Sequence, residues 1–359
     1  MEISMFNLLL ISGIILITLF VLFGSVKASS KENIQLVAVQ MEVNVSDYWS
    51  EKSFKIKIEE IMKKIEDEIN KDLPVLVVFP EDTGLLLINL GYKNLLQNVN
   101  TINSGIQTLS KRIFLQTLWT KIKTGLPWVP SLFFTRNQKI AGTYFNVFSE
   151  MAARYEVYLV AGSVILPDYP VNKGKVDIET PPDNKVYNIS YLFGPDGSII
   201  GKQKKVNLID LEKEEALNLN KGTIEELEVF DTELGKIGIA ICLDAFEDEV
   251  IEKLQEQGAD ILVQPSANPG AWTREQQLDW LNGSYKRVYL ESKFKYGINP
   301  MMVGSIWEIN FYGQTSIISK NNKGNINGYN NLKKLPGFLK TADSEDKEEI
   351  IVKEVPLDF

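Results

Sequence analysis

The chain has 359 residues, of which 44% are hydrophobic, and it carries a formal net charge of −9 with a pI near 5.0. This acidic balance, without a basic stripe interleaved with aromatic residues, argues against a nucleic-acid-binding protein. The sequence has one cysteine, Cys242, and no histidine, which excludes an internal disulfide, a Ser-His-Asp triad and nearly every zinc site. If Cys242 is a nucleophile, its base must be a carboxylate or a lysine.

The N-terminus carries no charge from Ile3 to Val26, which is long enough for a helix that spans a bilayer. The length of this run favours residues 1–30 as an uncleaved, single-pass transmembrane anchor. The sequence Val26-Lys27-Ala28 is also typical of a signal that is cleaved near Ala28, which would give a secreted protein. Lys27 and Lys31 follow the span, and by the positive-inside rule they weakly favour a cytoplasmic location for the domain that follows. The sequence therefore does not decide on which side of the membrane this domain lies.

A buried strand, an amphipathic helix and a second buried strand follow in that order. Residues 34–41 form the first predicted strand, and Ser46 is the predicted cap of a helix whose apolar positions recur at helical spacing up to Ile69. Residues 73–80 form the second strand, and Glu81 follows its last residue. This order indicates a crossover unit in an open sheet, where ligands bind beyond the strand ends.

The rest of the chain continues as an α/β pattern with no internal linker and no repeat. Helices are predicted over 145–156, 247–257 and 272–295, and the second of these ends at Gly258. Strands are predicted over 157–166, over 187–193 and 198–200 as a hairpin, and from 237 to just before Cys242. Further strands are predicted over 259–265, twice within 301–319, and over 350–355. We therefore expect one domain over residues 34–357.

Three strand ends carry residues with catalytic chemistry: Glu81, Lys205 and Cys242. Taken singly, each has a structural interpretation. Glu81 could be a solvated loop acid, Lys205 could belong to the charged run 202–205, and Cys242 could be a small buried hydrophobe. A cysteine between a strand end and a helix start is, however, well placed as a thiolate nucleophile, because a helix N-terminus favours negative charge.

Taken together, these residues resemble the nitrilase superfamily of carbon–nitrogen hydrolases. Glu81 stands in VVFPED, Lys205 in GKQKKVNL and Cys242 in GIAICLD, in the order and at the spacing typical of the family. The resemblance runs from about residue 34 to the C-terminus. It implies a four-layer α-β-β-α sandwich, here preceded by one N-terminal hydrophobic helix, with a Glu-Lys-Cys set, no cofactor, no metal, and assembly as a dimer or larger homo-oligomer.

The resemblance also implies roles for further residues. A second, substrate-orienting glutamate is expected several residues before a glycine; Glu215 fits best and Glu214 remains open. The backbone N–H of Leu243 and the side chain of Asn268 are assigned to oxyanion stabilisation or substrate binding. Asn207 stands where many members have histidine, and the residues after Cys242 lack the common Tyr, Arg and Pro, so the substrate is not predicted.

The implied function is hydrolysis of a non-peptide carbon–nitrogen bond in a small-molecule amide, or in a nitrile, through a cysteine acyl-enzyme. Two alternatives stay open. One is a membrane-associated N-acyltransferase that uses the same set, although the relatives of that type have several spans. The other is a non-catalytic anchored binding protein with a relic site, against which the intact Glu-Lys-Cys set argues.

The segment 88–143 is longer than the segment that family members usually have between the Glu81 strand and the next helix. It combines large apolar side chains, among them Trp119, Trp128 and Phe133, with basic residues such as Lys111 and Lys121. This composition is typical of a segment at a membrane surface. The alternative interpretation is an extra helix packed on the core. The hypothesis is a lid beside the active site that meets the bilayer or an amphiphilic substrate.

Overall fold

The computed structural model describes residues 33–179, 181, 183–213 and 216–357. Within these ranges, Asn33–Leu357 form one compact unit. The hydrophobic segment predicted over residues 1–30 lies outside the described residues. None of the helices in the described part of the chain combines the length and the apolar character that crossing a bilayer requires.

The larger sheet is mixed and contains ten of the described strands. Its central order is β12-β14-β1-β2-β3-β7-β4, with β15, β18 and β8 paired to β14, β1 and β7. β1 runs parallel to β2 and β14 and antiparallel to β18. The bounds are β1 (Asn33–Val43), β2 (Val75–Val78), β3 (Tyr158–Val160), β4 (Val164–Leu166), β7 (Tyr187–Phe193), β8 (Ile199–Lys204), β12 (Ser266–Ala267), β14 (Met301–Ile306), β15 (Ile309–Phe311) and β18 (Glu349–Pro356).

The second sheet has the order β17-β16-β13-β11-β10-β9. Its three central strands, β10, β11 and β13, are parallel, and the outer ones are antiparallel. The bounds are β9 (Val229–Thr232), β10 (Gly235–Ile239), β11 (Ile261–Val263), β13 (Tyr296–Asn299), β16 (Ser316–Ser319) and β17 (Phe338–Thr341); a short separate hairpin pairs β5 (Val171–Asn172) with β6 (Lys175–Val176).

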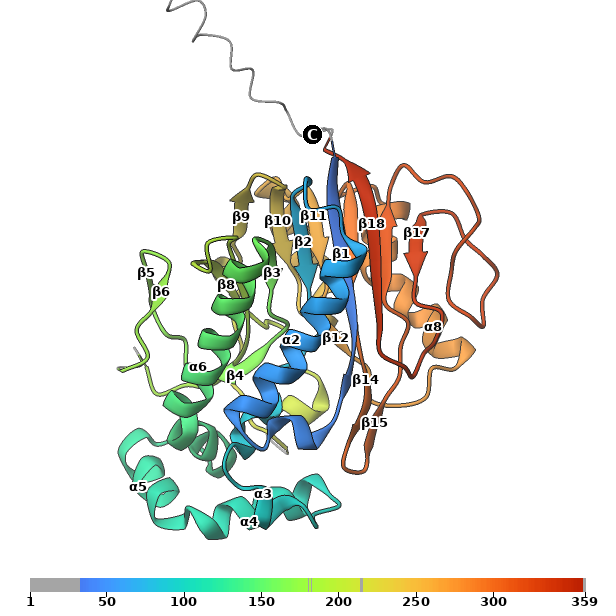
Figure 1. Cartoon of the computed structure of the whole chain (residues 1–359). Coiled ribbons are helices and arrows are strands. Elements are labelled where there is room, and N and C mark those ends of the chain that lie inside the picture. Colours follow the sequence, from blue (N-terminus) through green and yellow to red (C-terminus); the bar gives the residue numbers. More distant parts are fainter. Residues whose placement is uncertain (1–32, 180, 182, 214–215, 358–359) are drawn as a thin grey trace, which may run out of the picture. The chain divides into compact units, whose positions relative to one another are not determined.

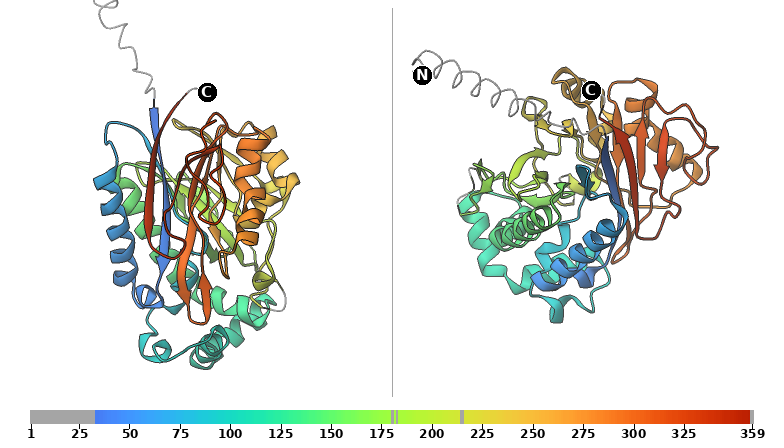
Figure 2. Two further views of the ribbon diagram at one scale, coloured as in Figure 1. Left: turned by 90° about the vertical axis from the view of Figure 1, so that its right-hand side faces the viewer. Right: turned by 45° about the horizontal axis from the view of Figure 1, so that its top comes forward.

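Side chains of β1 alternate between two cores, because successive residues of a strand point to opposite faces. Val37 and Val39 pack with the helices α2 (Glu51–Glu68) and α6 (Trp128–Tyr155), whereas Leu36 and Ala38 pack toward the second sheet. Figure 2 shows α2 and the helices that follow β10 on opposite sides of the strands. The predicted α/β fold is confirmed in this unit, and both of its large sheets are mixed.

The remaining helices lie in two places along the chain. η2 (Leu85–Asn89), α3 (Lys93–Leu96), α4 (Ile102–Arg112) and α5 (Phe114–Thr124) come before α6 and lie together at one end of the unit (Figure 1). The others follow the sheet strands: η3 (Asp210–Glu212), η4 (Ile224–Glu226), η5 (Cys242–Phe246), α7 (Asp248–Glu256), α8 (Arg274–Trp280) and η6 (Leu281–Leu290), while η1 (Val45–Tyr48) precedes α2.

Several predicted boundaries are wrong, each for a local reason. The cap of the first long helix is Ser50, not Ser46, because the Ser50 hydroxyl accepts from the Ser53 N–H and the short turn η1 takes up the residues before it. α6 begins at Trp128 rather than at residue 145. The predicted helix over 272–295 is α8 followed by η6 and then β13, and β13 and β17 were not predicted.

The predicted strand over 157–166 is two strands, β3 and β4, broken at Gly162. Gly162 has a φ of +65°, and a Cβ at this position would lie 2.0 Å from the Pro80 carbonyl oxygen. Only glycine allows this approach. Ser163 follows this break, and its hydroxyl accepts a hydrogen bond from the Asp82 N–H. This bond holds the chain that leaves β2. Gly162 thus helps to position the turn that carries Glu81.

Candidate active site

Glu81 lies three residues beyond β2 and is 2% exposed. Its Oε1 accepts hydrogen bonds from Lys205 Nζ at 2.7 Å and from Asn188 Nδ2 at 3.0 Å. The next residue, Asp82, has a φ of +61°, a left-handed conformation that is uncommon outside glycine. The tight turn brings the carboxylate back over the end of the sheet rather than out to solvent.

Lys205 directly follows β8 and is 1% exposed. Its ammonium lies between two carboxylates, 2.7 Å from Glu81 Oε1 and 2.6 Å from Glu212 Oε2. Its backbone is held on both sides, since its N–H donates to Asn188 and its carbonyl accepts from Gly222. The charged run 202–205 is therefore divided: Lys202 and Lys204 pair with Asp168, and Lys205 alone of these three points into the candidate site.

Cys242 begins η5, three residues beyond β10, and is 6% exposed. It has a φ of +49°, a strained conformation for a residue with a side chain. Its backbone is fixed there, because its N–H donates to Pro265 at 2.9 Å and its carbonyl accepts from Gln264 Nε2 at 3.1 Å. Strained, well-supported residues of this kind cluster at active sites, which supports a functional interpretation of Cys242.

The structure adds two residues that sequence reasoning did not select. Glu212, at the end of η3, contacts the Lys205 ammonium through Oε2 at 2.6 Å. Asn188 of β7 joins the two carboxylates, with Nδ2 3.0 Å from Glu81 Oε1 and 2.8 Å from Glu212 Oε1. Glu212 also accepts from the Ile209 N–H at 3.0 Å. The result is a closed network in which one ammonium and one amide hold two buried carboxylates.

Glu215 and Glu214, the residues considered for this role, lie outside the described residues. Glu212 stands three residues before Glu215 in the same acidic run. Nothing in the sequence singles out Glu212 from the two neighbouring glutamates.

Asp244 connects the lysine segment to the cysteine turn. Its carboxylate, completely buried, accepts from the backbone N–H groups of Val206 and Asn207 and from Asn207 Nδ2, at 2.7–3.2 Å. Asn207 is thus part of this link. The link fixes the position of Lys205 relative to Cys242, which lies two residues before Asp244.

Burial and neighbouring charges set the protonation of the three central groups. Burial raises the pKa of the Cys242 thiol well above its ordinary value, and the carboxylate of Glu81 raises it further, so the resting residue is a thiol. Burial also raises the pKa of Glu81, against the opposing effect of Lys205. Burial alone would lower the pKa of Lys205, but Glu81 and Glu212 hold it well above its usual range. Lys205 is therefore a permanent cation, and Glu81 is the group suited to exchange a proton.

Leu243 and Asn268, both assigned to oxyanion or substrate binding, line the same hollow as Cys242. Asn268 is 7% exposed, and its Nδ2 donates to the carbonyl oxygens of Tyr312 at 3.0 Å and Gly270 at 3.5 Å. Leu243 follows Cys242 directly, so its N–H lies at the start of η5.

Comparison with protein families gives a match to the carbon–nitrogen hydrolases over residues 119–323, which is more than half of the chain. The chain belongs to this family. A carbon–nitrogen hydrolase from Helicobacter pylori has a similar structure, with a TM-score of 0.59 and 20% identity over 91% of this chain and 90% of that one. A member of the nitrilase superfamily from Saccharomyces cerevisiae gives a TM-score of 0.56 and 21% identity, covering 90% of both chains. These similarities establish the shared fold.

Among curated proteins, an omega-amidase from Mus musculus is 29% identical over 147 residues, which is 39% of this chain and 48% of that protein. A probable hydrolase from Bacillus subtilis is 31% identical over 136 residues, covering 38% of this chain and 23% of that protein. The chain thus spans about half the length, or less, of these curated relatives.

Proposed function

We propose that this carbon–nitrogen hydrolase cleaves amide bonds through an acyl-enzyme formed on Cys242. The observation that carries the proposal is the buried contact of Lys205 with Glu81 and Glu212, at 2.7 and 2.6 Å, beside a cysteine held in a strained turn. Names of relatives that include amidases support the same reaction class. No metal ligand or cofactor group is needed for the steps below.

Acylation begins with the thiol, because its raised pKa leaves too little thiolate without a base. In the proposed reaction Glu81 takes the proton while Sγ attacks the amide carbon. The oxyanion that forms is stabilised by the Lys205 ammonium and the N–H of Leu243; losing one such donor commonly costs about 3 kcal/mol. The carbon–nitrogen bond then breaks, and Glu81 returns the proton to the leaving amine.

Deacylation uses the same groups in reverse. Glu81, again a carboxylate, takes a proton from a water that attacks the thioester carbon, and the carboxylic acid leaves as the thiol is restored. Glu212 does not exchange protons in this scheme. Through its 2.6 Å contact it keeps Lys205 charged and directed, and Asn188 keeps both carboxylates in place.

The test is a panel of primary amides, nitriles and N-substituted amides incubated with the full chain, with ammonia or amine release as the readout. We expect release from amides, at rates well above those from nitriles. Adding hydroxylamine or an amine acceptor separates hydrolysis from the alternative of N-acyl transfer, which would give acyl transfer to the acceptor as the main product. Failure to turn over any member, together with a Cys242 thiol that no alkylating probe labels near neutral pH, would indicate a relic site in a binding protein.

Residues 1–30 remain part of the proposal on sequence grounds alone. We propose that they serve as a single-pass anchor, with a signal cleaved near Ala28 as the alternative. Assembly as a homo-oligomer is proposed from the family resemblance in the same way. Mass determination of the mature N-terminus distinguishes the anchor from the cleaved signal.

A further inference from the structure

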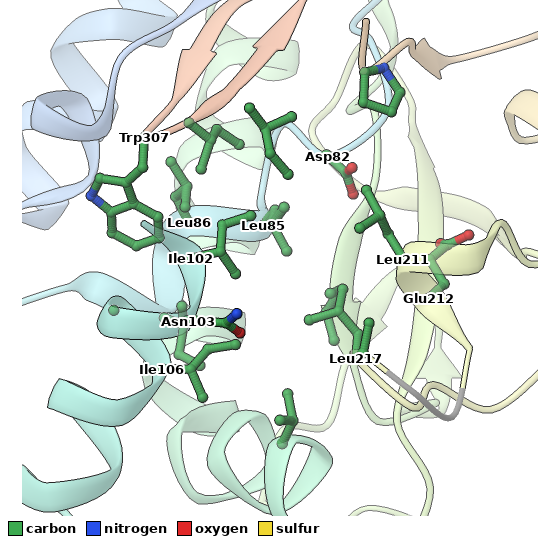
Figure 3. Close-up of a pocket in the computed structure, with 18 of the residues that line it drawn as sticks. Asp82, Leu85, Leu86, Ile102, Asn103, Ile106, Leu211, Glu212, Leu217 and Trp307 are labelled. Carbon is green, nitrogen blue, oxygen red and sulfur yellow. The ribbon is translucent and has the colours of Figure 1, made fainter. Parts of the chain in front are cut away.

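A cavity of about 570 Å³ lies beside the catalytic candidates. Figure 3 shows Asp82, Leu211 and Glu212 across the open space from Ile102 and Ile106 of α4. The cavity is a neighbour of the hollow that contains Cys242, because four residues line both spaces: Ile209, Leu211, Ala267 and Pro269. The cavity is therefore the nearest large space for the part of a substrate that lies beyond a carbonyl carbon at Cys242.

The lining is largely apolar, with two asparagines, Asn89 and Asn103, and its charged groups are all acidic. Leucine, isoleucine, valine and phenylalanine side chains predominate, and none of the described residues that line either space is a lysine or an arginine. The charged lining residues of the larger cavity are Asp82, Glu212 and Glu308. Burial, with the neighbouring carboxylates of Glu81 and Glu212, raises the pKa of Asp82 well above its usual range. An acyl group that ends in a carboxylate would lie among three acidic side chains, with no lining cation to pair with it.

We propose that this cavity binds the unbranched aliphatic acyl chain of the amide, so that the substrates are amides of medium-chain or long-chain fatty acids. The inference rests on the proposed function, because it assigns the acyl side of the same reaction. Small-molecule sites usually enclose about 300–1,000 Å³, so the volume suits a chain larger than an acetyl or propionyl group. The chain would run from Cys242 past Ala267 and Leu211 toward α4.

Much of the wall comes from the segment that is longer than the family usually has. Leu109 of α4 and Leu132 and Phe133 of α6 line the cavity and are at most 4% exposed. Phe133 therefore faces the interior, although the composition of segment 88–143 had suggested that this residue lies at a lipid surface. Trp128 is also partly buried, with its indole N–H bonded to Ser110. The segment thus contributes a binding wall.

The experiment measures kcat/KM for linear primary amides of two to twelve carbons. Each added methylene should raise kcat/KM roughly fourfold until the cavity is filled. Monoamides of dicarboxylic acids of equal length should react roughly a hundredfold more slowly or worse, because their carboxylate meets no cation. Ile106→Trp should lower the ratio of long-chain to short-chain kcat/KM, whereas Leu290→Trp, at an exposed position outside this segment, should leave that ratio as it is in the unmutated chain.

The outcomes separate this inference from the proposed function. Turnover of short amides with no gain from added methylenes overturns the acyl-chain assignment and leaves amide hydrolysis standing. A preference for dicarboxylic monoamides also overturns it. Calorimetric binding of decanamide and acetamide to Cys242→Ala supplies a readout without turnover. If Cys242→Ala binds decanamide more tightly than acetamide but the unmutated chain hydrolyses neither, the result supports the cavity as an acyl-chain site and contradicts the proposed amide hydrolysis.

A second observation concerns the outer face of α5. Phe114, Leu115, Trp119 and Ile122 are 48%, 77%, 66% and 69% exposed. Between Thr83 and Ser149 the sequence has seven lysines and arginines and no aspartate or glutamate, in a chain whose net charge is −9. A helix with large exposed apolar side chains in a purely basic segment is complementary to an anionic lipid surface.

We propose that α5 rests on an anionic membrane surface, with its apolar side chains in the lipid and the basic side chains near the headgroups. This position would bring the segment that lines the proposed acyl cavity to the bilayer surface, where fatty amides partition. The proposal does not require the cavity assignment, because it rests on the exposure and charge of α5 alone.

The test uses the full chain in a Cys242→Ala background, labelled with an environment-sensitive fluorophore through Leu115→Cys. Vesicles with phosphatidylglycerol should shift the emission to the blue, and phosphatidylcholine vesicles should do so less. The matched label at Leu290→Cys, 63% exposed and outside the segment, should respond little to either. Lys121→Gln with Lys123→Gln should weaken the response at position 115.

Equal responses at positions 115 and 290, or no response at 115, overturn this proposal. A blue shift at position 115 without vesicles that grows with protein concentration also overturns it, because α5 would then be covered by a second copy of the chain.

Discussion

Cys242→Ala is expected to abolish amide turnover while leaving the fold intact. The thiol is the only cysteine in the chain and is the proposed nucleophile, so no other side chain of this type can replace it. Removal of a covalent nucleophile commonly costs a factor on the order of 100,000 or more in kcat. The side chain is buried and small, so its loss of volume should cost about 1 kcal/mol or less of unfolding free energy.

The measurement is kcat on the best amide of the panel, with urea unfolding of both proteins as the control for folding. Retained turnover in a folded Cys242→Ala protein would end the assignment of the nucleophile. Cys242→Ser is a useful companion, because it keeps the shape of the site but offers a hydroxyl that Glu81 cannot deprotonate as readily.

Lys205→Ala should damage both catalysis and stability. It removes a proposed oxyanion partner, which predicts a loss of roughly a hundredfold to a thousandfold in the rate of acylation. It also leaves the buried carboxylates of Glu81 and Glu212 without their cation, and breaking a buried ion pair in this way typically costs about 3–5 kcal/mol. Single-turnover acylation and urea unfolding measure the two effects.

Two matched variants separate these effects. Glu81→Gln keeps a hydrogen-bonding side chain of the same shape and leaves Lys205 paired with Glu212, so acylation should slow by roughly a hundredfold or more with a smaller loss of stability. Lys204→Ala removes the neighbouring lysine, which pairs with Asp168 and Glu226 away from the site, and should leave acylation near that of the unmutated chain. A fall in deacylation alone for Glu81→Gln or Lys205→Ala would show that their roles are wrongly assigned.

The positions of Glu81 and Cys242 at strand ends could be predicted because each follows a short apolar run. Short apolar runs form buried strands almost regardless of the rest of the chain. Lys205 instead follows the polar run GKQK, and its place was implied by the resemblance of GKQKKVNL to a family segment. The sequence alone does not place β10, which precedes Cys242, in the second sheet while β2 and β8 lie in the larger one. The sequence does not determine which side chains complete the network. Asn188 lies inside β7 as an ordinary buried polar residue, and only the fold shows that it joins two carboxylates.

The second glutamate shows where spacing alone is insufficient. Glu212, Glu214 and Glu215 lie within four residues, and a loop can present any of them to Lys205. The choice depends on the turn of η3, which places Glu212 Oε2 at 2.6 Å from the ammonium and 3.0 Å from the Ile209 N–H. Periodicity cannot predict this, because a short turn has too few residues to show a period.

The segment 88–143 was predicted as an element added to the family pattern. Its composition could not show which of its side chains face the core and which face solvent. Phe133 and Trp119 are both aromatic residues near basic side chains. The start of α6 at Trp128 directs Phe133 into the cavity, where it is 4% exposed, while Trp119 on α5 is 66% exposed. Helix boundaries decide which side chains face the core, and these boundaries are the least predictable part of a helix.

The most direct test of the account is the mass of the intact chain after rapid mixing with a reactive amide and quenching in acid. The account predicts an added mass equal to the acyl group, located on the peptide that contains Cys242, in the unmutated chain and not in Cys242→Ala. It further predicts that the adduct forms more slowly in Glu81→Gln. Steady amide turnover with no adduct at Cys242 under any quench time, or the same adduct in Cys242→Ala, would contradict it.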